Sequence, residues 1–404
     1  MKLALLGSDD EAIALVRAAL DSGRHTLVWA GETGDAPGMA NRLPEAANLP
    51  GGDWESLAGG VADMVIVSAT GDLARRAEQL RYLVQAGVAV SVTNCVALGP
   101  IVCYELDMNR VETESPIVPY LPTRWHPAIA QISGLAINDG LSQISFERGV
   151  ASVHSEPVTA ALARDVDVVR AICGEVTRLS AVGVPQGPAA PDRDFSALNV
   201  YLTTGLGTTV RWSVDRQLPP GHGRITLEGV SGRAVLAMRG ETWVLTRWSP
   251  PSDEPLAPAE QSYSAWHPAE AMLVPLEAQF SGKGVAPTWL DASRAADIAD
   301  MLEVSLRRSR TIDIYNETYN EQGTFKGMMG IAGCGLLLVA LFTLLAAALG
   351  QKTAKFFGLE WLATAFGYWH YALLAVLVAF LALQLLRFAV PTTPATPPPT
   401  NRDD

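Results

Sequence analysis

Two long stretches near the C-terminus carry no charged side chain, and no other feature of the sequence restricts the fold so strongly. They cover residues 327–350 and 361–386. An α-helix rises about 1.5 Å per residue, so about 20 apolar residues cross the roughly 30 Å hydrocarbon layer of a bilayer. The sequence therefore predicts a transmembrane hairpin over residues 327–390, with the lipid bilayer as a partner. Two helices buried in a protein core are the alternative, but uncharged runs of this length are uncommon there.

The residues around these stretches predict the orientation of the hairpin. Aromatic residues typical of membrane interfaces lie near the start of the second stretch: Trp361, Tyr368, Trp369 and Tyr371. Four basic residues precede the first stretch (Arg307, Arg308, Arg310 and Lys326), whereas the connection between the stretches offers Lys352 and Lys355. Because basic residues favour the cytoplasmic side, we predict a two-pass membrane protein with cytoplasmic N-terminal domains. The Pro- and Thr-rich residues 391–404 predict a disordered tail.

The charge and cysteine content argue against several kinds of partner. The chain has 42 acidic and 30 basic residues and a formal net charge of −12. Nucleic-acid affinity comes mainly from Lys and Arg on phosphates, so we predict no nucleic-acid partner. The cysteines, Cys95, Cys103, Cys173 and Cys334, include no CxxC pair. Neither a disulfide framework nor a metal site is therefore expected.

Apolar strands alternate with helices through the first part of the chain. The predicted strands cover residues 2–6, 25–30, 64–69 and 88–92, and the predicted helices cover residues 11–20 and 73–85. The continuous apolar run over residues 64–69 is typical of a strand buried on both faces. Strands that alternate with helices form a parallel sheet with right-handed crossovers. Residues 1–120 are therefore predicted to form a Rossmann-like domain of the dinucleotide-binding type.

The first strand-to-helix turn is where such a domain holds the pyrophosphate of a dinucleotide, on the pattern G-x-G-x-x-G/A. Here residues 7–12 read Gly-Ser-Asp-Asp-Glu-Ala, so Asp9 replaces the glycine that lets the backbone approach the phosphates. Carboxylates at this helix terminus satisfy its dipole themselves. Glu32 lies where an acidic residue binds ribose hydroxyls, although it could equally be a solvated loop residue. The candidate binding residues for NAD or NADP are Gly7, Ser8, Asp9, Ala12, Glu32 and Thr70.

The middle of the chain predicts a second sheet. Apolar and polar residues alternate, as in half-buried strands, over residues 143–146, 176–182, 195–203, 208–214, 224–228 and 243–247.

An ordered set of stretches resembles one family of oxidoreductases. It comprises residues 63–70 and 86–90, Arg124-Trp125-His126-Pro127, and residues 138–141, 165–174, 280–283 and 291–310. The set is similar to the Gfo/Idh/MocA oxidoreductases, the group of glucose–fructose oxidoreductase and inositol dehydrogenase, over about residues 1–313. The resemblance implies an α+β domain with an open, mostly antiparallel sheet over residues 121–320. It also implies hydride transfer with NAD(P) on sugars, polyols or related compounds, and a homo-oligomer formed through the second sheet.

The residues that the resemblance would make catalytic are altered. Thr93-Asn94-Cys95 stands where the family has Glu-Lys-Pro, and Arg164 stands where its helix carries a histidine. An arginine cannot accept a proton at neutral pH, although it could orient a carboxylate substrate or pair with Asp165 or Asp167. The substitute catalytic candidates are Asn94, Cys95, Arg164, His126 and Arg124, with His154, Tyr104 and Asp194 more loosely placed.

Two functional hypotheses follow from these alterations. The first is a membrane-anchored relative of this family that no longer carries out hydride transfer and serves as a ligand-binding or scaffold protein, with a membrane protein as one conceivable partner. The second is an active NAD(P)-dependent oxidoreductase with substituted catalytic residues. The loss of the middle glycine, the lysine and the histidine favours the first hypothesis, because hydride transfer needs both the cofactor and a group that handles the proton.

Overall fold

The computed structural model describes residues 1–33, 39–139, 141–150, 155–185, 195–230, 232–249, 257–283 and 287–314, with isolated residues between 342 and 371. The chain divides into two compact units, Met1–Asn316 and Glu317–Asp404. The predicted hairpin and tail fall in the second unit and, apart from those isolated residues, lie outside the described residues. Within the described part of the chain, no helix combines the length and the hydropathy needed to cross a bilayer.

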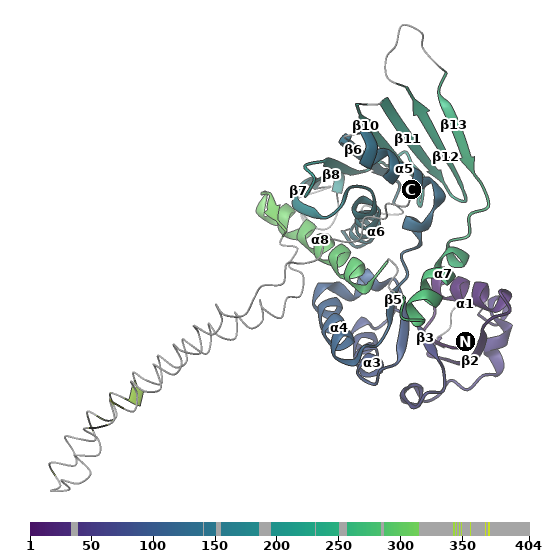
Figure 1. Cartoon of the computed structure of the whole chain (residues 1–404), viewed down its shortest axis with the longest axis vertical. Helices are drawn as coiled ribbons and strands as arrows, with labels where there is room; N and C mark the ends of the chain where they lie inside the picture. Colours follow the sequence, from purple (N-terminus) through teal and green to yellow (C-terminus); the bar gives the residue numbers. More distant parts are fainter. Residues whose placement is uncertain are drawn as a thin grey trace, which may run out of the picture. The chain divides into compact units, whose positions relative to one another are not determined.

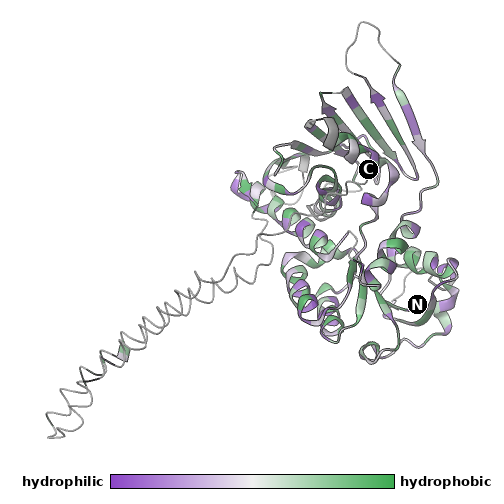
Figure 2. Cartoon of the chain, in the orientation of Figure 1, coloured by the Kyte–Doolittle hydropathy of each residue, from purple (hydrophilic) through white to green (hydrophobic). Residues whose placement is uncertain are grey.

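The first sheet is parallel, with the strand order β2-β1-β3-β4-β5 (Figure 1). Its strands are β1 (Lys2–Leu6), β2 (Thr26–Gly31), β3 (Met64–Ser68), β4 (Ala89–Thr93) and β5 (Ile117–Pro119). Every residue of β3 and β4 is buried, as the apolar run over residues 64–69 predicts. Figure 2 shows how hydrophobic these central strands are. The predicted Rossmann-like parallel sheet is therefore confirmed.

Helices cover both faces of this sheet. On one face lie α1 (Asp10–Asp21) and α7 (Pro268–Phe280), and on the other lie α3 (Leu73–Gln85), α4 (Gly99–Thr113) and α8 (Trp289–Arg308). Short helical segments fill the connections: α2 (Met39–Arg42), η1 (Pro44–Asn48), η2 (Trp54–Gly59), η3 (Cys95–Leu98) and η4 (Pro122–Trp125). Because α7 and α8 come from the end of the first unit, this domain is completed by residues far along the chain.

The second sheet is mixed, with the strand order β13-β12-β11-β10-β6-β9-β8-β7-β14. Its strands are β6 (Leu141–Arg148), β7 (Val176–Pro185), β8 (Phe195–Thr204), β9 (Thr209–Val214), β10 (Gly223–Gly229), β11 (Gly232–Arg239), β12 (Thr242–Trp248), β13 (Ala259–Tyr263) and β14 (Ile312–Asp313). Among the strands that the structure describes in this sheet, β6 and β9 pair in parallel and the other neighbours are antiparallel. The mostly antiparallel second sheet is therefore confirmed.

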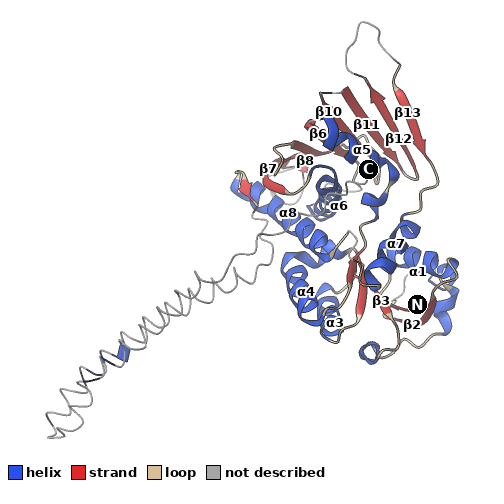
Figure 3. Ribbon diagram, viewed as in Figure 1, coloured by secondary structure: helices blue, strands red, loops and turns tan. Residues whose placement is uncertain are grey.

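One face of the second sheet packs against helices (Figure 3). These are α5 (Pro127–Asp139), α6 (Ser155–Cys173) and α8. Along β10, β11 and β12, buried side chains alternate with partly or fully exposed ones, the pattern of a sheet with one covered face. Trp212 and Phe146 are among the largest side chains that this face buries completely.

Helix α8 belongs to both cores. Ala292 and Ala296 pack in the core of the first sheet, whereas Ile298 and Leu302 pack in the core of the second. Asp291, in the first turn of α8, accepts a hydrogen bond from the backbone N–H of Thr288 at 2.7 Å in a capping box. A single helix thus contributes apolar side chains to the two halves of the first unit.

Asp291 also binds two arginines from other elements. Arg124 of η4 lies 3.3 Å from its carboxylate, and Arg170 of α6 lies 2.9 Å away. Arg124 pairs in addition with Asp167, which is 1% exposed. This group of four alternating charges fixes the entrance to the second domain against the start of α8.

A buried carboxylate locks α6 onto the second sheet. Asp165 is 1% exposed and pairs with Arg148 at the end of β6. It also accepts a hydrogen bond from the Trp212 indole N–H of β9 at 2.7 Å. Buried charges of this kind are tolerated only when they are paired and hydrogen-bonded.

Asp165→Ala is expected to lower the free energy of unfolding by about 3–5 kcal/mol, because it leaves the Arg148 guanidinium largely buried without its carboxylate. The matched control is Arg178→Ala, which removes the exposed ion pair with Asp313 and should cost less than about 1 kcal/mol. Urea unfolding followed by circular dichroism measures both. A loss for Asp165→Ala as small as that of the control would show that this pair does not hold α6 in place.

Candidate functional site

The turn between β1 and α1 lies at the carboxyl end of the parallel sheet, where open α/β sheets bind ligands. Gly7 has a φ of +77°, which favours glycine. A Cβ atom at this position would lie 2.7 Å from Nη2 of Arg76. The backbone N–H of Gly7 donates to the carbonyl of Gly31 at the end of β2, at 3.0 Å. The backbone conformation therefore favours glycine at this position, and a side chain there would have to displace the end of Arg76.

Asp9, which replaces the middle glycine, binds to its own protein. Oδ1 accepts a hydrogen bond from the backbone N–H of Ala12 at 2.7 Å, so Asp9 caps α1. Oδ2 accepts hydrogen bonds from the hydroxyls of Ser68 at 2.6 Å and Thr93 at 2.7 Å. The carboxylate thus joins the ends of β3 and β4 to the start of α1. It occupies the helix terminus at which a Rossmann-like domain holds pyrophosphate.

A second carboxylate of the same turn reaches the other domain. Glu11 lies 3.3 Å from the guanidinium of Arg164 on α6. Burial raises the pKa of Glu11, although Arg164 and the backbone N–H of Asn94 lower it in part. The sequence motif included Glu11 only as one of several acidic residues. Its pairing with Arg164 depends on how the two domains pack together, and no local sequence pattern predicts that packing.

The Thr93-Asn94-Cys95 segment supplies no cation where the family has a lysine. Asn94 has a φ of +50° and donates a hydrogen bond from Nδ2 to the carbonyl of Ala69 at 3.1 Å. Cys95 is 1% exposed, and burial raises the pKa of its thiol well above the usual value. A thiol of this kind stays protonated and unreactive at neutral pH. Neither side chain can stand in for the charge of a lysine.

The other two catalytic candidates face different partners. Arg124 is held by Asp167 and Asp291. His126 is fully buried and stacks on Trp243, with ring centres 3.9 Å apart. Its Nδ1 accepts a hydrogen bond from the backbone N–H of Ala128 at 3.1 Å. The structure therefore brings Asn94 and Arg164 together around Glu11, but engages Arg124 and His126 in packing and ion pairing.

The remaining candidates lie elsewhere. Tyr104 is on α4 and is half exposed. His154 and Asp194 lie outside the described residues. Among the residues that the structure describes, no group of three or more His, Cys, Asp or Glu side chains is placed to hold a metal ion.

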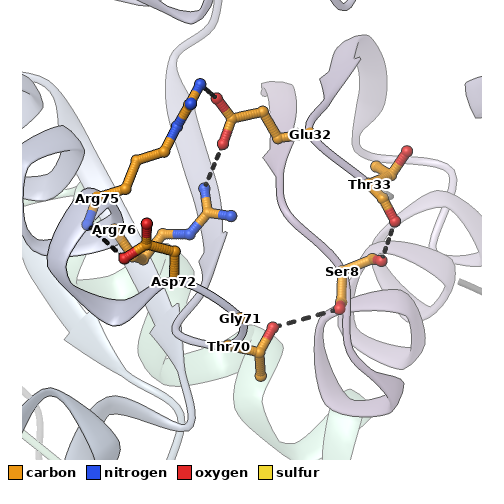
Figure 4. Close-up of a pocket in the computed structure, with 8 residues that line it drawn as sticks. All are labelled: Ser8, Glu32, Thr33, Thr70, Gly71, Asp72, Arg75 and Arg76. Atoms are coloured by element: carbon orange, nitrogen blue, oxygen red, sulfur yellow. Dashed lines mark hydrogen bonds and ion pairs between the residues drawn. The ribbon is translucent and has the colours of Figure 1, made fainter. Parts of the chain in front are cut away.

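An open pocket of about 470 Å³ lies beside the turn (Figure 4). It is lined by Ser8, Glu32, Thr33, Thr70, Gly71, Asp72, Arg75 and Arg76. Three of the predicted cofactor-binding residues, Ser8, Glu32 and Thr70, therefore meet in one place. Gly7, Asp9 and Ala12 form the adjacent turn rather than the pocket lining. The Ser8 hydroxyl donates a hydrogen bond to the backbone carbonyl of Thr33 at 2.6 Å, and the Thr70 hydroxyl donates to the backbone carbonyl of Ser8 at 3.5 Å.

Glu32 is surrounded by donors on one side of this pocket. Its Oε1 accepts hydrogen bonds from Arg75 at 2.5 Å and from Gln79 at 2.8 Å. The guanidinium of Arg76 lies 3.4 Å from its Oε2. Burial alone would raise the pKa of Glu32, but Gln79, Arg75 and the charge of Arg76 lower it below its usual value. The carboxylate is therefore ionised at neutral pH and can accept hydrogen bonds from ligand hydroxyls. Sequence reasoning identified Glu32 but missed both arginines, which lie on the following α3.

The burial of His126 predicts a loss of stability in mild acid. Its pKa is lowered to about 4 by burial, whereas the unfolded side chain titrates near 6.5. The unfolded state therefore binds a proton first, and stability present above pH 6.5 is lost as the pH falls toward 4. Between pH 7 and pH 5, protonation of His126 in the unfolded state should lower the free energy of unfolding by about 2 kcal/mol.

Urea unfolding of the wild type and of His126→Phe at both pH values measures that cost. The phenylalanine keeps an aromatic ring in the cluster but cannot titrate, so its pH dependence should be smaller by about 2 kcal/mol. Equal pH dependence in the two proteins would show that His126 does not remain neutral in the folded state.

Comparisons with known proteins show which solved structures share this fold. No known family profile matches the sequence, and no curated protein matches it in sequence. Solved structures do resemble it. A levoglucosan dehydrogenase in complex with NADH matches with a TM-score of 0.63 and 14% identity, over 78% of this chain and 100% of that chain.

Two further structures cover the same share of the chain. The aldose–aldose oxidoreductase of Caulobacter crescentus, complexed with glycerol, has a TM-score of 0.61 and 15% identity, with 99% of that chain covered. The myo-inositol dehydrogenase of Corynebacterium glutamicum has a TM-score of 0.59 and 14% identity, again with 99% covered. The first unit of this chain therefore has the fold of the Gfo/Idh/MocA-type NAD-binding oxidoreductases.

Proposed function

We propose that this chain is a relative of the Gfo/Idh/MocA-type oxidoreductases that binds a small polar ligand and does not carry out their hydride transfer. The observation that carries the proposal is the position of Asp9. Its carboxylate caps α1 and accepts hydrogen bonds from Ser68 and Thr93. These contacts use the helix terminus that would otherwise receive the pyrophosphate of NAD(P).

Electrostatics opposes a dinucleotide at this position. A pyrophosphate carries negative charge, and two unit charges 4 Å apart repel each other by about 4 kcal/mol at an effective dielectric constant of 20. A cost of that size corresponds to roughly a thousandfold in affinity. The residues present therefore do not fit the phosphates of NAD(P) while Asp9 keeps its contacts.

The catalytic groups support the same proposal. Arg164, at the position of the family's histidine, stays protonated and pairs with Glu11. The Cys95 thiol is buried and protonated. Of the sequence-predicted catalytic candidates that the structure describes, none can exchange a proton near neutral pH beside Asn94.

The open pocket indicates the size and chemistry of the ligand. A volume of about 470 Å³ lies within the range of small-molecule sites. Ser8, Thr33 and Thr70 contribute hydroxyls, and the ionised Glu32 can accept hydrogen bonds from a diol. A hydroxyl-bearing compound of nucleoside size suits this lining, and such a ligand does not need the space that Asp9 takes.

An active NAD(P)-dependent oxidoreductase with substituted groups is the second candidate. The observation that favours it is the raised pKa of Glu11, which burial causes. A carboxyl group that holds its proton closer to neutral pH is suited to acid–base catalysis. Glu11 lies beside Asn94, at the position of the family's lysine, so it could serve in place of the missing groups.

Calorimetry with NADH and adenosine separates the two candidates. We expect no NADH binding to the wild type at millimolar concentration, and at least about tenfold tighter binding to Asp9→Gly, because the variant removes the opposing charge. Glycine is itself a tolerated N-cap, but the buried hydroxyls of Ser68 and Thr93 lose their acceptor, so this substitution should lower the free energy of unfolding by about 1–3 kcal/mol. Adenosine, which has no phosphate, should bind both proteins equally.

The matched control is Asp10→Gly, which removes a carboxylate from the same turn; that carboxylate is exposed and pairs with Arg42. It should leave NADH binding as weak as in the wild type. Micromolar binding of NADH to the wild type would overturn the proposal in favour of the oxidoreductase. Failure of adenosine to bind would reject the assignment of the pocket but not that of Asp9.

We further propose that residues 327–350 and 361–386 anchor the chain as a two-pass membrane protein with the first unit in the cytoplasm, where it can form homo-oligomers or meet a membrane-protein partner. The support is the absence of charged residues from both stretches. After an alkaline carbonate wash, the full chain should stay with the membrane pellet, and a chain ending at Asn316 should be released. Release of the full chain would contradict the anchor.

A further inference from the structure

Helix α4 exposes four large apolar side chains to solvent. Ile101 is 74% exposed, Tyr104 50%, Met108 38% and Val111 55%. Burying an apolar side chain is worth about 1.5–3 kcal/mol, so leaving this group in water forgoes a sizeable gain. Single exposed apolar residues are ordinary, whereas a contiguous set marks an interaction surface.

The spacing of these residues places them on one line. They follow one another at intervals of three, four and three, which is the spacing of the a and d positions of a heptad. We call Ile101, Tyr104, Met108 and Val111 the α4 stripe. Four side chains at this spacing span about three helical turns. The α4 stripe is therefore built like one half of a helix–helix contact.

The opposite side of α4 is already used by the fold. Cys103 and Leu106 are fully buried in the core of the first sheet. The indole N–H of Trp289 on α8 donates to the carbonyl of Cys103 at 2.8 Å. The helix is thus held firmly against its own domain by one apolar face, and the α4 stripe is a second apolar face that the fold does not require. Figure 1 shows α4 beside α3 at the margin of the first domain.

Acidic residues border the α4 stripe on both sides. Glu105 and Glu112 occupy the flanking e positions, and Asp107 occupies the flanking g position. Arg81 of α3 pairs with Glu105 at 2.8 Å, and Arg110 pairs with Asp107 at 2.8 Å. Glu112 is exposed and adds a further negative charge. The border of the α4 stripe is therefore net negative, in keeping with the net charge of −12 of the chain.

We propose that the α4 stripe is the docking site for a cationic amphipathic helix of another protein, with apolar residues at heptad spacing and Lys or Arg at the flanking positions. Charge complementarity selects this occupant. Pairing two copies of α4 would bring their acidic borders together, and like charges at e and g positions disfavour such a dimer. An anionic lipid surface is disfavoured for the same reason. The inference does not depend on the proposed ligand or on the absence of hydride transfer.

A synthetic helical peptide tests the inference on the full-length chain in a non-ionic detergent. The probe is a labelled peptide of about three heptads with Leu at the a and d positions and Lys at the e and g positions. A second peptide carries Glu in place of every Lys. Fluorescence anisotropy should show binding of the Lys peptide that weakens as salt is added, and binding of the Glu peptide at least about tenfold weaker.

Substitutions in the α4 stripe identify the surface. Ile101→Ser combined with Val111→Ser should weaken binding of the Lys peptide by roughly tenfold or more, because interface anchors are removed. Both residues are exposed, so the fold should tolerate the change. Val274→Ser on α7, which is 61% exposed, is the matched control and should leave binding unchanged.

Several outcomes would overturn the inference. Equal binding of the Lys and Glu peptides would show that charge does not select the partner. Unchanged binding to the Ile101→Ser, Val111→Ser variant would place the contact elsewhere. Self-association of the wild type that disappears in this variant, measured by light scattering, would show that a second copy of the chain is the occupant.

Discussion

The two halves of the first unit are held together by the charges around Asp291. This carboxylate begins α8, closes its capping box, and binds Arg124 from the entrance of the second domain and Arg170 from α6. Burial alone would raise the pKa of Asp291, but Arg124, the Thr288 backbone N–H and Arg170 lower it, so the group stays ionised. Removing one partner from such a set leaves an uncompensated buried charge. The placement of α8 across both cores, and of α6 beside the turn between β1 and α1, depends on this set of charges.

Because α6 is fixed in this way, its Arg164 faces the first turn of α1 and meets Glu11. The result is a domain junction that the protein closes with its own charges. Asp9 holds the ends of β3 and β4 to α1, and Glu11 joins α1 to α6. Open α/β sheets bind ligands at this edge, and here the acidic turn makes contacts within the chain. The neighbouring pocket at Glu32 stays open.

The surface of the first domain shows a similar division of roles. One face of α4 stabilises the core, and the other carries the α4 stripe. The exposed apolar face adds nothing to the stability of the domain, and natural proteins seldom expose such patches without a partner. The acidic border limits which partners can approach, since only a cationic surface gains from it.

Much of the architecture could be predicted from the sequence, because local periodicity reports local structure. The continuous apolar run of residues 64–69 predicts β3, and alternating residues predict strands of the second sheet. Gly7 identifies the first turn, and its positive φ is the conformation that favours glycine. The replacement of the middle glycine by Asp9 is likewise visible in the sequence alone, at the position where dinucleotide-binding domains hold phosphate.

Only the tertiary structure decides what those side chains do. Asp9 reaches Ser68 and Thr93, and Glu11 reaches Arg164, over separations that no periodic pattern encodes. The family resemblance implies a catalytic role for His126, yet the rings of Trp243, Tyr263 and Trp266 pack around it. Its burial is set by residues more than a hundred positions away. The sequence by itself determines which segments become strands and helices, because the periodicity of apolar residues is local. The chemistry of the site depends on contacts between residues far apart in the sequence, which form only in the folded chain.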